Sequence, residues 1–203
     1  INVTAGALVL TVAANGSVWV ANKQGASLSV IDPATLTVSR TITLPRGSQP
    51  FGVATSASGF ALAVLEGSGQ LLKFDTASYA QTGSRALGTN PRHVSISADG
   101  ATAYVSRFIT PPLPGESTAA VAPTAATGGE VLTIDTATLN LVRSVVLAHS
   151  DKADAENQGR GVPNYLGPVV ISPDGTSGWV PSKKDNIKRG TLRSGGNLNF
   201  QNT

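Results

Sequence analysis

The densest group of residues that could do chemistry lies in the stretch HSDKADAENQGR. Its carboxylate and amide oxygens are hard ligands on a short segment, and Ca²⁺ accepts about six to eight such ligands. The spacing lacks the D-x-D-x-D-G order of an EF-hand loop, so a solvated polar loop or a partner-docking loop is a second interpretation, which we favour. The candidate calcium ligands are Asp151, Asp154, Glu156 and Asn157, and the same stretch holds two candidate ligand-binding residues, His149 and Arg160.

A hydrolase would need a base beside a nucleophile or an activated water, and the candidate bases are His93, His149, Glu66 and the acids of that stretch. None has a partner at a diagnostic spacing. The sequence has no G-x-S-x-G elbow, no H-E-x-x-H pair and no phosphate-cradling glycine loop. It also has no cysteine, which excludes thiolate nucleophiles and thiolate metal sites within these residues. We therefore predict no catalytic residue.

Two recurring patterns indicate the elements that must position these residues. One is a strand, an Asp-x-Ala-Thr/Ser turn and a second strand, as in SLSVIDPATLTVSRTITL, QLLKFDTASYAQTGSRAL and EVLTIDTATLNLVRSVVL. The other is a strand, a tight Ser-x-x-Gly or Asp-Gly turn and another strand, and it begins at Pro50, Pro91 and Pro168. Pro50 and Pro91 are 41 positions apart, and Asp32 and Asp75 are 43 apart. The chain is therefore built from a repeat.

A period of about 40 to 50 residues with four short strands in each unit is the signature of a β-propeller, whose units are twisted antiparallel blades. The composition agrees, because 22 glycines and 12 prolines favour short strands and turns. We predict an all-β fold, a single repeat array over residues 1–203. The expected blades cover approximately 7–44, 50–87, 91–147 and 168–203, and Trp19 and Trp179 are expected to pack the blades.

The units resemble the YVTN-type β-propeller repeat. VWVAN at Val18, AYVSR at Ala103 and GWVPS at Gly178 stand where that family has its YV-T-N strand, whereas ALAVLE at Ala61 departs from it. DPATLTVSRTITL from Asp32 and the PxxV…S-x-DG pattern also match. The resemblance covers nearly the whole chain.

This resemblance implies an exported bacterial or archaeal protein, extracellular, on the cell surface or periplasmic, with a binding or scaffolding role. Some relatives are lactonase-like enzymes, and others carry c-type haem modules, for which this chain lacks the motif. Members of this family usually resemble closed rings of six to eight blades. We therefore expect an arc of a larger ring, closed by further blades of a longer polypeptide or by another chain. The absence of methionine, even at Ile1, also favours a processed chain or a fragment.

Two departures from the repeat indicate a functional face. Val20 and Asp32 are 12 positions apart, but the equivalent Val105 and Asp135 are 30 apart, which places one insertion at about 108–128. A second insertion, at about 148–165, lies between blades. In an up-and-down blade both connections emerge on the face where the inner strands begin, and such loops are where binding concentrates. The candidate ligand-binding residues on that face are Phe51, Arg92, His93, Arg107, His149, Arg160, Asn164 and Tyr165.

Two of these residues are open to more than one interpretation. Arg92 and Arg107 could hold an anionic ligand by bidentate hydrogen bonds, or they could bridge neighbouring blades through backbone carbonyls. On the opposite face, Asp99-Gly100 and Asp174-Gly175 are expected to form turns only, because an aspartate side chain satisfies the local backbone and glycine supplies positive φ.

The net charge of the chain and its distribution limit the classes of binding partner. Fifteen basic and twelve acidic residues give a net charge of +3, and most are dispersed, so nucleic acid is not implied. The one dense basic run, from Lys183 to Arg193, could meet phosphates or an anionic surface, but we favour a polar strand whose charges discourage edge pairing. No apolar run approaches the length of about 18 residues that spans a bilayer. We predict a non-enzymatic binding scaffold for a protein, extracellular polymer or redox partner. The alternative is a lactonase-like or other metal-dependent propeller hydrolase.

Overall fold

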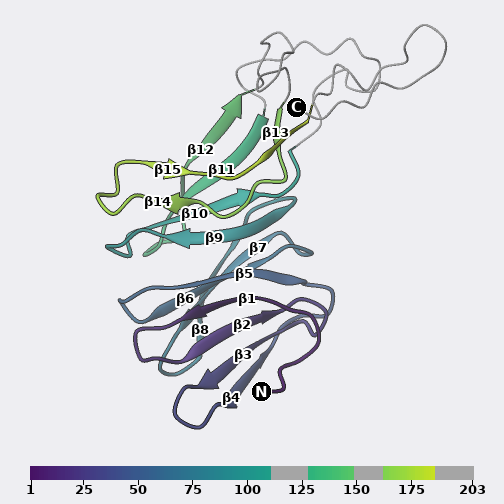
Figure 1. The fold of residues 1–203 in the computed structure, drawn as a ribbon, viewed down its shortest axis with the longest axis vertical. Helices are drawn as coiled ribbons and strands as arrows, with labels where there is room; N and C mark the ends of the chain where they lie inside the picture. The colour runs from purple at the N-terminus through teal and green to yellow at the C-terminus, as the bar shows by residue number, and fades with distance from the viewer. Residues whose placement is uncertain (111–127, 149–161, 186–203) are drawn as a thin grey trace, which may run out of the picture.

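A computed structural model describes residues 1–110, 128–148 and 162–185, and within these ranges the chain is all β with no helix. It therefore contains no described helix that could cross a membrane. Three four-stranded antiparallel sheets follow one another in chain order, which confirms the predicted fold class (Figure 1). Their strands are β1 (Ala7–Val12), β2 (Val18–Asn22), β3 (Ser27–Asp32) and β4 (Thr37–Thr43); β5 (Pro50–Thr55), β6 (Phe60–Leu65), β7 (Gln70–Asp75) and β8 (Gln81–Ala86); β9 (Pro91–Ile96), β10 (Thr102–Arg107), β11 (Gly128–Asp135) and β12 (Leu141–Ala148).

A fourth unit consists of two short pairs of strands. Strand β13 (Val162–Asn164) pairs with β16 (Lys183–Asp185), and β14 (Val170–Ile171) pairs with β15 (Gly178–Trp179). Residues 162–164, assigned from sequence to the second insertion, are thus a strand of this unit. We call the three sheets and this unit the first to fourth blades.

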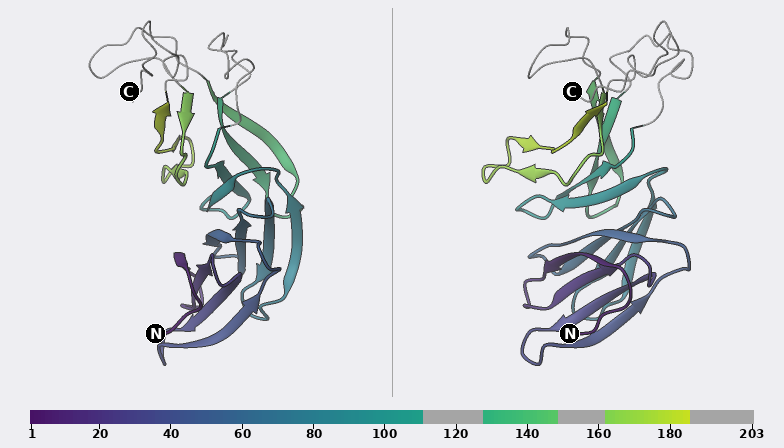
Figure 2. Two further views of the ribbon diagram at one scale, coloured as in Figure 1. Left: turned by 90° about the vertical axis from the view of Figure 1, so that its right-hand side faces the viewer. Right: turned by 45° about the vertical axis from the view of Figure 1, so that its right-hand side comes forward.

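The blades stack along a curve, with the first and fourth at opposite ends (Figure 2). Strand β5 contacts both β1 and β9, so the first strand of each blade is the inner one. The side chains of each strand match its position in the blade. All six residues of β6 (FALAVL) are buried because both faces of that sheet are covered, whereas the fourth strand β8 (QTGSRA) is largely exposed.

The hydrophobic cores lie between the blades. One joins Trp19, Leu28 and Val30 of the first blade to Val53 and Phe74 of the second. A second core joins the second blade to the third, and a smaller one joins the third to the fourth. Each blade therefore depends on its neighbours for burial, as in other repeat proteins.

The predicted turns are confirmed. The Asp32 carboxylate accepts hydrogen bonds from the amides of Ala34 (2.7 Å) and Thr35 (3.1 Å), and Asp75 and Asp135 do the same in their blades. On the same face, Asp99 accepts from the Ala101 amide at 3.0 Å and Asp174 from the Thr176 amide at 3.1 Å. These bonds satisfy the local backbone. The pKa values of Asp99, Asp135 and Asp174 are held below the ordinary value chiefly by hydrogen bonds from the hydroxyls of Ser97, Thr138 and Ser172, and then by the amide bonds. The Ser78 amide is the largest cause of the lowered pKa of Asp75.

The residue four places after each of the strand-ending aspartates adopts the left-handed conformation, although none is glycine. These residues are Leu36 (φ 53°), Tyr79 (φ 62°) and Leu139 (φ 59°). Leu36 is 62% exposed, but Leu139 is buried in the core between the second and third blades.

Replacing Leu36 by glycine is therefore expected to raise the free energy of unfolding by up to about 1 kcal/mol, because a side chain is strained at positive φ. Leu139→Gly relieves the same strain but loses core contacts, so a net loss of stability is expected. Urea denaturation of the two variants tests this pair. If both variants shift stability in the same direction, backbone strain and burial do not act as described.

Candidate functional site

One backbone arrangement repeats at the start of every inner strand in the first three blades. The residue before the strand has positive φ, and its carbonyl accepts a hydrogen bond from the first residue after the second strand. The pairs are the amide of Lys23 to Gly6 (2.8 Å), of Glu66 to Gln49 (3.0 Å) and of Phe108 to Asn90 (2.8 Å). The arrangement brings two repeat positions together on one face. One is the second residue of the inner strand, and the other is the first residue of the loop that follows the second strand.

These two positions supply most of a line of cationic and aromatic side chains, which we call the cation–aromatic row. Lys23 Nζ lies 5.5 Å from the ring centroid of Phe51, and Arg92 Cζ lies 4.7 Å from the same ring. Arg92 Cζ is also 3.2 Å from the Phe108 centroid. Such contacts are each worth about 0.5–2 kcal/mol. The row then continues into the fourth blade, where Phe108 meets Tyr165 (5.1 Å) and Lys183 lies 5.5 Å from Tyr165.

Glu66 binds two members of the row. Its Oε2 accepts from Lys23 Nζ at 2.6 Å, and its Oε1 accepts from Arg92 Nε at 2.8 Å and from Arg92 Nη2. Burial acts to raise the pKa of the Glu66 carboxyl, but the hydrogen bonds and charges of Lys23 and Arg92 outweigh it, so the pKa is lowered. Glu66 is therefore a fixed anion and not a proton acceptor at neutral pH.

His93 packs beside the row. Its ring meets Phe51 edge to face, with centroids 5.1 Å apart. Burial, followed by the positive charge of Arg92, lowers the pKa of His93 against a smaller opposing effect of Glu66. The imidazole is consequently neutral at pH 7, and it contributes an aromatic surface more than a charge.

The Arg107 side chain is held by hydrogen bonds to other groups of the protein. Its Nε donates to Glu130 Oε2 at 2.6 Å, and its two terminal nitrogens donate to the carbonyls of Leu87 (2.7 Å) and Thr89. These carbonyls belong to the connection between the second and third blades. Of the two interpretations open from sequence, the structure therefore places Arg107 in the bridging one.

The other predicted residues fall into two groups. Asn164 accepts hydrogen bonds from the amides of Thr110 (2.8 Å) and Tyr165 (3.0 Å), which ties the two insertion points together, and Tyr165 is 41% exposed. The remaining predicted residues lie outside the described ranges: His149, Asp151, Asp154, Glu156, Asn157 and Arg160. Within those ranges, no group of three or more histidine, aspartate or glutamate residues could hold a metal ion.

Sequence reasoning missed two members of the row, Lys23 and Phe108, considered Lys183 only as part of the basic run, and considered Glu66 only as a base. All four stand at one repeat position, directly after the second strand motif (VWVAN, ALAVL, AYVSR and GWVPS). A comparison of that single column between units would have found them.

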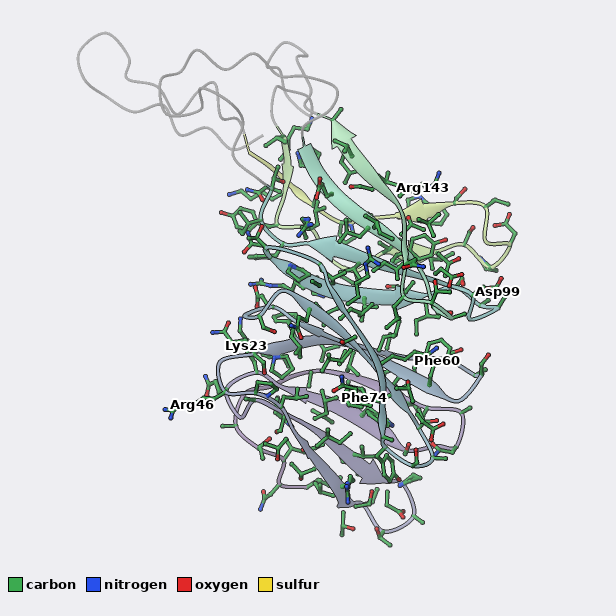
Figure 3. The ribbon with its side chains drawn as sticks, turned by 180° about the vertical axis from the view of Figure 1, so that it is seen from behind. Lys23, Arg46, Phe60, Phe74, Asp99 and Arg143 are labelled. Atoms are coloured by element: carbon green, nitrogen blue, oxygen red, sulfur yellow. The ribbon has the colours of Figure 1, made fainter. Side chains whose placement is uncertain are left out.

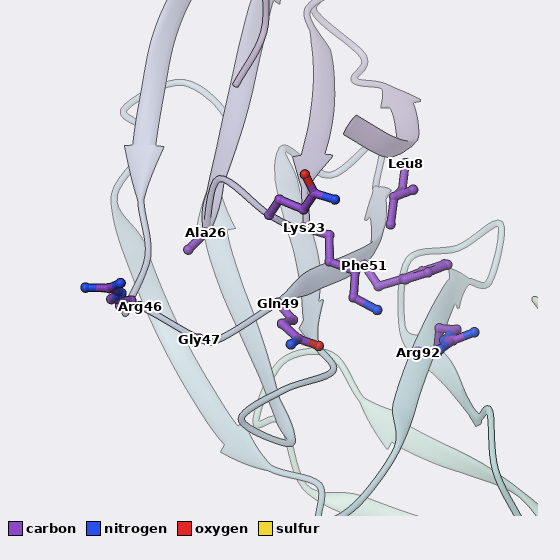
Figure 4. A pocket seen from close by; sticks show the side chains of 9 residues that line it. Leu8, Lys23, Ala26, Arg46, Gly47, Gln49, Phe51 and Arg92 are labelled. Carbon is purple, nitrogen blue, oxygen red and sulfur yellow. The ribbon is translucent and has the colours of Figure 1, made fainter. Parts of the chain in front are cut away.

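A cleft opens beside the row between the first and second blades, with a volume of about 670 Å³ (Figure 4). Lys23, Arg46 and Arg92 line it together with Gln49 and Phe51. Figure 3 shows Lys23 and Arg46 at one edge of the molecule and Asp99 at the opposite edge, so the cleft lies away from the Asp99-Gly100 turn.

Comparisons with known proteins identify the fold alone. No protein-family model and no curated protein sequence matches the chain. Among solved structures, hydrazine synthase of Kuenenia stuttgartiensis matches with a TM-score of 0.64 and 20% identity over 95% of this chain and 45% of its own. A functionally unknown protein from Desulfotomaculum acetoxidans matches at 0.63 and 15% identity over 99% of this chain and 56% of its own. Virginiamycin B lyase of Staphylococcus aureus matches at 0.59 and 13% identity over 90% of this chain and 57% of its own.

Hydrazine synthase and virginiamycin B lyase have β-propeller-like folds, and this chain spans about half the length of each of the three neighbours. At these low sequence identities the matches show the fold alone. The activity and partners of this chain must therefore be inferred from its own residues.

Proposed function

We propose that this chain is a non-enzymatic binding part of a β-propeller that holds a protein or an extracellular polymer on the face bearing the cation–aromatic row. The observation that carries the proposal is the row itself, because its members come from all four blades and meet on the face that receives both insertions. Cationic and aromatic side chains on a rigid scaffold are typical of binding surfaces.

The ionisable groups of the row support binding over catalysis. Glu66 is held as an anion by two cations, His93 is neutral and packed on Phe51, and Arg107 is bonded to Glu130 and to two carbonyls. None of these groups is placed beside a second residue as a nucleophile–base pair. The metal-dependent hydrolase is retained as the alternative outcome of the experiment below.

We further propose that the repeat is of the YVTN type and that the parent protein is exported. The family motifs support this, because VWVAN forms β2, AYVSR lies in β10 and GWVPS begins at β15. VWVAN and AYVSR thus each lie in the second strand of their blades, and GWVPS begins in β15, which pairs with β14.

Further blades are proposed to continue the arc at both ends. Leu10 and Val12 of β1 are 63% and 60% exposed, whereas Val53 and Val94, which stand at the Leu10 position, are 4% and 7% exposed because a preceding blade covers them. At the other end, Trp179 is 59% exposed. Such apolar faces favour a packed neighbour. A crystal structure in which β1 packs against β15 within one closed monomer would contradict this continuation.

The binding proposal can be tested by biolayer interferometry with the immobilised chain and four polymers: polyglutamate, polygalacturonate, polylysine and dextran. The polyanions are expected to bind at low salt and to dissociate in high salt, because the row and its cleft are cationic. A Phe108→Ala/Tyr165→Ala variant is expected to lose at least about tenfold in affinity. No retention of any polymer, together with lactone hydrolysis abolished by EDTA, would instead support the hydrolase.

A further inference from the structure

The cleft between the first and second blades carries an unbalanced positive charge. Its lining contains three cations, Lys23, Arg46 and Arg92, and no carboxylate side chain. Outside the lining, Glu66 pairs with both Lys23 and Arg92, so one negative charge is shared between two positive ones. Arg46 is exposed and makes no ion pair with the described residues. The cleft therefore attracts anions, and the attraction is screened by salt.

The cations at the inner side of this cleft are held in place before a ligand arrives. Glu66 fixes Lys23 and Arg92 by hydrogen bonds of 2.6 and 2.8 Å, and the side chains of Glu66 and Arg92 are only 12% and 17% exposed. Figure 4 shows Arg92 and Phe51 together on one side of the cleft and Arg46 on the other. A pre-positioned charge costs less conformational entropy on binding than a free side chain.

The chemistry of the lining indicates which anion fits. Stacking of a sugar ring requires an open aromatic face, but Phe51 already contacts Arg92 and Lys23 and makes a T-shaped contact with His93. The remaining polar groups are the amides of Gln24 and Gln49, which both donate and accept hydrogen bonds as a peptide backbone does. This combination suits a carboxylate side chain carried on an extended peptide.

We infer that the cleft between the first and second blades binds the carboxylates of an acidic polypeptide segment. The inference rests on the proposed binding function and gives the chemical class of its partner. Lys23 and Arg92 receive a carboxylate on the inner side, Arg46 adds attraction at the rim, and Gln24 and Gln49 meet the backbone of the segment.

The test uses fluorescein-labelled hexaglutamate and fluorescence anisotropy at low salt. The decisive variant is Gln24→Glu, which places a carboxylate in the lining with almost no change of shape. Its matched control is Gln81→Glu on the exposed strand β8, which changes the net charge by the same amount away from the cleft. Gln24→Glu is expected to weaken binding about fivefold or more, and Gln81→Glu by less than about twofold.

A second variant gives an effect of the opposite sign. Glu66→Gln removes the shared negative charge beside the cleft and also loosens Lys23 and Arg92. The neutral amide still accepts hydrogen bonds from these two cations, so the gain in positive charge is expected to outweigh the lost positioning and hexaglutamate to bind more tightly. Equal losses in Gln24→Glu and Gln81→Glu would overturn the inference, since they would show attraction by net charge alone. Tighter binding of a labelled tetragalacturonate than of hexaglutamate would also overturn it, while leaving the proposed binding function of the face intact.

Discussion

Replacing Trp19 by alanine is expected to lower the free energy of unfolding by about 3–5 kcal/mol. Trp19 is fully buried and packs against Phe74 (6.1 Å between centroids) and Tyr79 (5.9 Å), both from the next blade. Its indole nitrogen has no hydrogen-bond partner among the described residues, so packing is its contribution. The loss would therefore report the stability of the junction between the first and second blades, measured by urea denaturation.

Trp179 provides a matched control at the equivalent repeat position. It is 59% exposed, so Trp179→Ala is expected to change the free energy of unfolding of this chain by less than about 0.5 kcal/mol. Equal destabilisation by the two substitutions would contradict the assignment of the stabilising cores to the junctions between blades.

Replacing Glu66 by glutamine is expected to lower the free energy of unfolding at pH 7 by about 1–3 kcal/mol. The substitution leaves Lys23 and Arg92 partly buried without their shared counterion. Thermal unfolding of the variant and the parent chain at pH 7 measures this loss, and an unchanged melting temperature would contradict a stabilising role for the two ion pairs.

The same variant should change the pH dependence of stability. Because the pKa of Glu66 is lower in the folded chain than its ordinary value of 4.5, the carboxylate stabilises the fold above pH 4.5, and this stabilisation is lost as pH falls through the folded pKa. The difference in stability between the parent chain and Glu66→Gln should therefore be constant near neutrality and close in acid. A difference that grew on acidification would contradict the lowered pKa.

The repeat made the fold predictable from sequence because each blade uses the same local chemistry. Asp32, Asp75 and Asp135 each cap a turn through their own neighbouring amides, so their role can be deduced from a few adjacent residues. The same holds for the contrast between the continuous apolar sequence of the buried strand β6 and the polar sequence of the largely exposed strand β8. The capping aspartate recurs in each of the first three blades.

The site was less predictable because its contacts join different blades. Phe51 and Arg92 were expected on the correct face, but their contact depends on how far the second blade is rotated against the third, which no local pattern encodes. Lys23 was missed because its partner Glu66 is 43 residues away. Arg107 and Arg92 looked equivalent in sequence, yet a carbonyl-rich connection surrounds one and two phenylalanine rings surround the other.

The central claim about function is that the face bearing the cation–aromatic row binds the partner. Hydrogen–deuterium exchange with and without polyglutamate tests this claim most directly. The prediction is slower exchange in the loops at 23–26, 45–49, 66–69 and 87–90, with no change in the turns at 13–17, 56–59 and 97–100 on the opposite face. Protection confined to the opposite turns, or spread equally over both faces, would contradict the claim.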